Sequence, residues 1–170
     1  MTGAQDAHAA PVGDRLATAV GLLRASDYAG ALTHLEALLA EAPDDPAGLA
    51  YAGMAHLHLK DVQTAQELLD RAVAAGPTDF IARSKRGELR FTLACFPQAA
   101  EDLREALRLE APTPASRRWV AKLLETAEQR AKLSYTRTLT LPSLAPLKTL
   151  VSLPRLPRWW RRGVRGVATV

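Results

Sequence analysis

Residues 53–77 read GMAHLHLKDVQTAQELLDRAVAAGP, and this stretch decides the fold because its pattern recurs once earlier and once later in the chain at a constant spacing. The recurring positions carry small or apolar residues: Ala19, Gly53 and Gly87; Tyr28, Val62 and Phe96; Ala31, Ala65 and Ala99; Leu35, Leu69 and Leu103; Leu38, Ala72 and Ala106. A unit of about 34 residues cannot bury its own apolar face, so such units stack against one another. The period therefore predicts a repeat array that serves as a non-catalytic binding scaffold.

Turn-forming residues fall where the helices of each unit should begin and end. Ser26 or Asp27 can accept backbone N–H bonds at the start of a second helix, and Asp61 has the same role one unit later. Pro43 and Pro77 occupy the same position in successive units and end the second helices, because the residue before a proline disfavours the helical conformation. Each unit is therefore predicted to be a helix, a short turn and a helix.

A helical hairpin of about 34 residues resembles the tetratricopeptide repeat (TPR). The middle and third units carry its pattern at Gly53, Ala65, Leu69, Ala72 and Pro77, and at Gly87, Phe96, Ala99, Leu103 and Ala106. The chain departs from the family where a tryptophan often opens the motif, at Arg15, Leu49 and Arg83, and where a leucine accompanies the first small residue, at Thr18, Ala52 and Arg86. These departures predict looser packing of the first helices.

The resemblance implies an all-α, right-handed TPR-type helical solenoid of three repeats with a C-terminal capping helix. We expect a disordered N-terminus at 1–11, repeats at 12–45, 46–79 and 80–113, the capping helix at 114–133, and an irregular basic tail, rich in proline, leucine and arginine, at 134–170. Thr113 and Pro114 suit the start of the capping helix, and Trp119 is expected to pack in its apolar face. Residues 135–141 alternate in polarity and suggest an extended strand.

Composition favours a reduced, cytoplasmic protein. The single cysteine, Cys95, cannot form an internal disulfide and is expected to be a small buried residue. The first residues lack the pattern of a signal peptide, and no apolar stretch is long enough to predict a membrane span. We therefore expect a cytoplasmic location, with membrane association through the tail as an alternative.

Motifs for catalysis or metal binding are missing from the sequence. His56 and His58 are two residues apart on a predicted helix, so they point to different faces and cannot chelate as a pair four residues apart would. The sequence also shows no Cys/His cluster, phosphate-binding glycine loop or nucleophile elbow. We expect no enzyme activity, no cofactor and no metal.

The resemblance implies that the first helices line a groove that holds an extended peptide. The expected groove residues are Leu16, Val20, Leu23, Arg24, Ala50, Met54, Leu57, His58, Ser84, Glu88, Phe91, Thr92, Arg118 and Lys122. Chaperone-binding members of the family grip a C-terminal carboxylate with asparagine, lysine and arginine, whereas this chain has no asparagine and carries Leu16 and Val20 at clamp positions. We therefore predict an adaptor or chaperone that binds an apolar peptide or partner protein.

The tail differs in charge from the rest of the chain. Residues 134–170 carry seven basic residues and no acid, which leaves a net charge of −3 on residues 1–133 out of +4 overall. The residues expected to mediate tail interactions are Arg155, Arg158, Trp159, Trp160, Arg161 and Arg162. The alternatives are a tail that occupies the groove in cis, a membrane-peripheral scaffold whose tail adsorbs to anionic lipid, a secretion-type chaperone and, least favoured, nucleic-acid binding.

Overall fold

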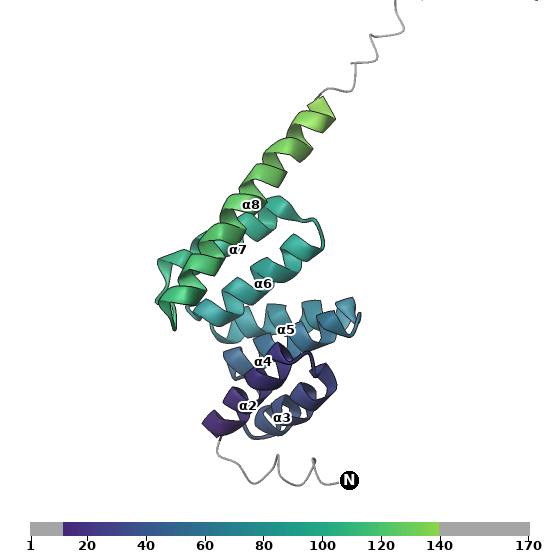
Figure 1. Cartoon of the computed structure of the whole chain (residues 1–170), viewed down its shortest axis with the longest axis vertical. Coiled ribbons are helices and arrows are strands. Elements are labelled where there is room, and N and C mark those ends of the chain that lie inside the picture. Colours follow the sequence, from purple (N-terminus) through teal and green to yellow (C-terminus); the bar gives the residue numbers. More distant parts are fainter. Residues whose placement is uncertain (1–11, 140–170) are drawn as a thin grey trace, which may run out of the picture. The chain divides into compact units, whose positions relative to one another are not determined.

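The structure, a computed structural model, describes residues 12–139, and these form seven α-helices and no strand (Figure 1). The helices are α2 (Val12–Arg24), α3 (Tyr28–Glu41), α4 (Pro46–His58), α5 (Val62–Ala75), α6 (Phe80–Thr92), α7 (Phe96–Arg108) and α8 (Pro114–Leu139). The most extensive contacts join α2 to α3, α4 to α5 and α6 to α7, so the helices form consecutive hairpins that stack. The predicted all-α helical repeat solenoid is confirmed.

Aspartate side chains begin four of these helices. They accept backbone N–H bonds from the residue three positions later: Asp27 from Gly30, Asp45 from Gly48, Asp61 from Thr64 and Asp79 from Ala82. The bonds from Thr64 lower the pKa of Asp61, because they stabilise the ionised carboxylate. Thr113 begins α8 by accepting the N–H bond of Ser116 at 3.1 Å, as the sequence predicts.

The turns between the two helices of each hairpin share one backbone conformation. Ser26, Lys60 and Ala94 occupy the same position in successive units and adopt left-handed φ angles of 64°, 71° and 59°. The N–H of the following residue then bonds to the carbonyl five positions back, as from Asp27 to Leu22 at 2.9 Å, and this closes the first helix. Asp27 rather than Ser26 is therefore the cap of the second helix.

The two helices of the second and of the third hairpin approach closely at the first small position of the repeat. A Cβ atom added to Gly53 would lie 2.8 Å from Cγ of Leu69 and 3.2 Å from the carbonyl oxygen of Ala65. A Cβ added to Gly87 would lie 2.8 Å from Cγ of Leu103. Glycine is needed at these two positions because no other residue leaves room for the leucine of the facing helix.

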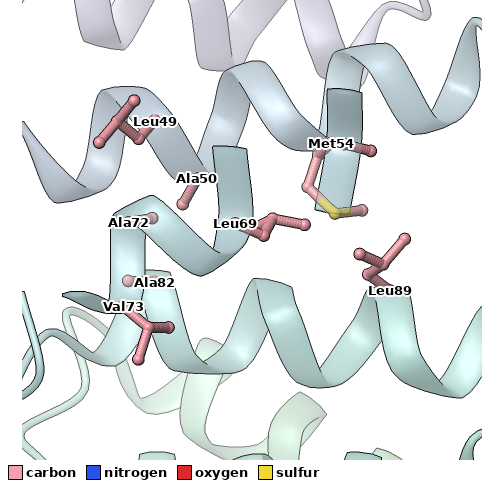
Figure 2. Close-up of a cluster of buried hydrophobic side chains, with 9 residues drawn as sticks. Leu49, Ala50, Met54, Leu69, Ala72, Val73, Ala82 and Leu89 are labelled. Carbon is pink, nitrogen blue, oxygen red and sulfur yellow. The ribbon is translucent and has the colours of Figure 1, made fainter. Parts of the chain in front are cut away.

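The core lies between the hairpins, where small and large apolar residues interlock. Figure 2 shows Leu69 of α5 together with Ala50 and Met54 of α4 and with Ala82 and Leu89 of α6. All five residues are buried, and Ala50, Leu69 and Ala82 have no exposed surface. This burial of apolar surface is the main force that holds successive hairpins together.

An ion-pair network forms around Arg86, the residue that stands in the third repeat where the family motif has a leucine. Asp102 of α7 is 2% exposed and accepts hydrogen bonds from Nε and Nη2 of Arg86, at 2.9 and 2.7 Å. Arg90 lies 2.8 Å from the same carboxylate, and Asp70 of α5 pairs with Arg86 at 3.1 Å. The hydrogen bond to Asp102 raises the pKa of Arg86, and burial opposes this only in part. The expectation of looser packing is therefore wrong for this repeat.

A buried arginine occupies the position of the missing motif tryptophan in the first repeat. Arg15 of α2 is 3% exposed, pairs with Glu41 at 2.8 Å and donates to the carbonyl oxygen of Ala37 at 3.3 Å. Both partners belong to the end of α3. Arg15 thus joins the two helices of the first hairpin through polar contacts, in place of an aromatic side chain.

Three other expectations are wrong for the described residues. Cys95 is exposed, because it lies in the turn before α7 rather than within an apolar face. Trp119 is 43% exposed, so it does not pack in the apolar face of α8, whose buried residues are Val120 and Ala127. Residues 135–139 continue α8 and are not part of a strand. The predictions for 1–11 and for 140–170 lie outside the described residues.

We predict opposite effects when alanine replaces two helical glycines. Gly53→Ala forces Leu69 to shift and should lower the free energy of unfolding by about 1–3 kcal/mol. Gly21→Ala, on the exposed face of α2 with nothing within 4 Å, should raise it by about 0.5–1 kcal/mol through helix propensity. Urea denaturation of the two variants measures both values, and stabilisation by Gly53→Ala would contradict the close approach.

The ion-pair network predicts a large difference between two carboxylates that bind the same guanidinium. Asp102→Ala leaves the half-buried Arg86 and Arg90 without their buried counter-charge and should destabilise the protein by about 1.5–3 kcal/mol. Asp70→Ala removes an exposed partner of Arg86 and should cost at most about 1 kcal/mol. Thermal and urea denaturation test this comparison, and equal losses would argue against a buried network.

Candidate functional site

The first helices and α8 enclose a largely apolar pocket of about 510 Å³. Residues from α2, α4, α6, the connection before α8 and α8 itself line it, so every hairpin contributes to one site. The lining residues are Val20, Leu23, Arg24, Tyr51, Met54, His58, Phe80, Ile81, Ser84, Lys85, Glu88, Pro112, Thr113, Ala115, Ser116, Trp119 and Val120. A pocket of this size accommodates several side chains of a partner segment.

The structure brings half of the predicted groove residues together in this pocket. Those that line it are Val20, Leu23, Arg24, Met54, His58, Ser84 and Glu88. They share one face of their helices, because the first helices of successive hairpins present the same register positions to the pocket.

The remaining predicted groove residues do not line the pocket. Ala50 is fully buried between hairpins, and Leu16, Leu57 and Phe91 pack at the edges of the apolar core clusters. The ring of Phe91 also lies 5.5 Å from that of Phe96. Thr92, Arg118 and Lys122 are exposed outside the pocket. The sequence register was therefore too broad, since it assigned inter-hairpin contacts to the groove.

A lysine held between two aromatic rings is the main feature that the sequence reasoning missed. The Nζ atom of Lys85 lies 5.2 Å from the ring centre of Trp119 and 5.9 Å from that of Tyr51. It also pairs with Glu88 at 2.9 Å. The side chain thus bridges α4, α6 and α8 by cation–π contacts and an ion pair. Tyr51 and Lys85 occupy the same position in successive units, and both line the pocket. The repeat register therefore marks this position, which the sequence analysis did not assign to the groove.

The end of the pocket formed by α2 and α4 is polar at its rim. The His58 ring stacks on that of Tyr28, with ring centres 4.5 Å apart and planes at 5°. Arg24, the last residue of α2, is exposed and lines the same pocket as His58. Arg24 is therefore placed to meet a polar group of whatever enters the pocket.

Residues 12–139 hold no group of three or more His, Cys, Asp or Glu side chains placed to bind a metal ion. Within that part of the chain, no helix is long and apolar enough to cross a membrane. The tail residues Arg155, Arg158, Trp159, Trp160, Arg161 and Arg162 lie outside it.

The fold and pocket define an all-α helical-repeat protein, and residues 22–89 match the tetratricopeptide repeat family model. Residues 22–89 are therefore tetratricopeptide repeats, which confirms for this stretch the resemblance seen in the sequence. Among the curated proteins, none matches the chain by sequence.

Solved TPR domains have the same fold. The chain is similar to the first TPR domain of Spaghetti (RPAP3) bound to the HSP90 peptide SRMEEVD, with 21% identity, a TM-score of 0.60, and coverage of 71% of this chain and 95% of that one. The TPR2B domain of yeast Sti1 in a pHsp70 complex is 19% identical, with a TM-score of 0.59 and coverage of 70% of this chain and 97% of that one. The first TPR domain of human RPAP3 is 21% identical, with a TM-score of 0.53 and coverage of 69% of this chain and 95% of that one. At these identities the likeness shows the fold alone.

Fluorescence tests the position of Lys85 over Trp119. In the full chain carrying Trp159→Phe and Trp160→Phe, Trp119 is the single tryptophan. Lys85→Ala removes the side chain above its ring, so acrylamide should quench the Trp119 emission more efficiently. Arg118→Ala, exposed next to Trp119 but outside the pocket, is the control and should leave quenching unchanged. Equal quenching in all three proteins would contradict the contact.

Proposed function

We propose that this protein is a non-enzymatic interaction scaffold, an adaptor or chaperone that binds an apolar segment of a partner protein in the pocket. The observation that carries the proposal is that Trp119 is 43% exposed, although it lines a pocket together with apolar residues such as Val20, Met54 and Ile81. A large aromatic residue left half-exposed in an apolar hollow is a common anchor for a partner side chain. Burial of apolar partner side chains there would supply the affinity.

The solved relatives support a peptide partner as a class. Two of them are named as complexes, one with the HSP90 peptide SRMEEVD and one with pHsp70. This chain differs in the chemistry available for such a peptide, because it has no asparagine and carries Leu16 and Val20 at clamp positions. An apolar segment fits the pocket better than a free C-terminal carboxylate does.

Site-specific crosslinking tests the proposal directly. A photoreactive amino acid at position 119 should form adducts with partner proteins in the host cell, because this residue lies in the pocket. The same amino acid at position 66, exposed on α5, should not form these adducts. Adducts shared by both positions, or none at position 119, would refute binding in the pocket.

A pair of substitutions distinguishes binding in the pocket from non-specific binding to exposed hydrophobic residues elsewhere on the surface. Leu23→Asp places a charge at the apolar wall and should reduce the adduct at position 119 at least about tenfold. Leu59→Asp makes the same change at a hydrophobic residue that is 47% exposed and does not line the pocket, and it should leave the adduct intact. Equal loss in both variants would contradict the assignment.

A further inference from the structure

The charges that line the pocket do not balance. Lys85 is neutralised by Glu88 at 2.9 Å, and Glu88 is the single acidic residue of the lining. Arg24 is exposed and makes no ion pair or hydrogen bond to any side chain in the described part of the chain. One positive charge therefore remains uncompensated at the α2 end of the pocket.

This positive charge stands out because the surrounding body is acidic. Residues 1–133 carry a net charge of −3, and exposed acids lie on the second helices, at Glu36 of α3, Glu67 of α5 and Glu101 of α7. The pocket is lined instead by the first helices and α8. The second helices therefore carry more acidic than basic residues, although Arg71, Arg104 and Arg108 are exposed there too, whereas the charged side chains of the pocket are Arg24, Lys85 and Glu88.

We infer that the pocket recognises an amphipathic partner segment, in which apolar side chains are followed or preceded by an acidic side chain that pairs with Arg24. This inference rests on the proposed function and adds the charge of the partner. The apolar side chains contact Leu23, Met54 and Trp119, while the carboxylate meets the guanidinium at the exposed rim. An exposed pair of this kind contributes less to affinity than to the orientation and choice of the partner.

The charge preference also bears on the chain's own tail. Residues 134–170 are leucine-rich but contain seven basic residues and no acid, so they cannot supply the carboxylate. Like charges placed next to each other at an interface disfavour the wrong partner. The pocket should therefore prefer an acidic segment of another protein to this tail.

Three synthetic peptides test the inference with the full chain. They share one leucine- and valine-rich sequence with acetylated and amidated ends, and they differ in carrying two Asp, two Ser or two Lys residues at one end. The amidated end removes the free carboxylate, so side-chain charge alone varies. Fluorescence anisotropy at low salt should give a dissociation constant at least about fivefold lower for the Asp peptide than for the Lys peptide.

Charge reversal at the pocket provides the matched controls. Arg24→Glu should reverse the preference, so that the Lys peptide binds more tightly than the Asp peptide. Arg118→Glu changes an exposed cation outside the pocket by the same charge and should leave the preference intact. A preference that survives Arg24→Glu, or that Arg118→Glu removes equally, would overturn the inference.

The remaining outcomes distinguish this inference from the proposed function. If all three peptides bind equally and Leu23→Asp weakens all of them, the pocket binds apolar segments and the charge inference is wrong. If no peptide binds the full chain, the inference and the proposed function both fail. Tighter binding of a peptide with the sequence of residues 134–170 than of the Asp peptide would also overturn the inference and would favour the tail as the occupant.

Discussion

The close approach of the two helices in the second and third hairpins is the constraint on which the rest of the structure depends. At Gly53 and Gly87 the missing side chain lets Leu69 and Leu103 of the facing helix lie against the backbone. With the hairpins this tight, the second helices fill the spaces between units with buried leucines and alanines. The first helices then keep one face for the pocket, so packing within the hairpin determines where binding chemistry can be placed.

Charge is distributed according to the same geometry. Where a first helix meets its second helix, an arginine pairs with a carboxylate and one member of the pair is buried: Asp102 in its pair with Arg86, and Arg15 in its pair with Glu41. These pairs replace residues that the family usually fills with leucine or tryptophan, and they tie specific helices together because a buried charge without its partner is costly. Lys85 and Arg24 belong to a different class, since they line the pocket rather than the hairpin interface.

The fold could be predicted from the sequence because the repeat period records backbone contacts that recur in every unit. The site could be predicted only in part, because neighbouring register positions on one helix differ in what they contact: Val20 lines the pocket, whereas Leu16, one turn earlier, packs against the apolar core. Trp119 and Cys95 were misassigned as buried, since their exposure depends on how α8 and a turn meet the array. Nothing local in the sequence reports that tertiary arrangement.

The central claim is that the face formed by the first helices and the start of α8 binds the partner. Hydrogen–deuterium exchange of the full chain, with and without the leucine-rich Asp peptide, tests it most directly because it reports on each helix separately. We expect added protection in α2, α4, α6 and the first turns of α8, with α3, α5 and α7 unchanged. Protection confined to α3, α5 and α7 would contradict it.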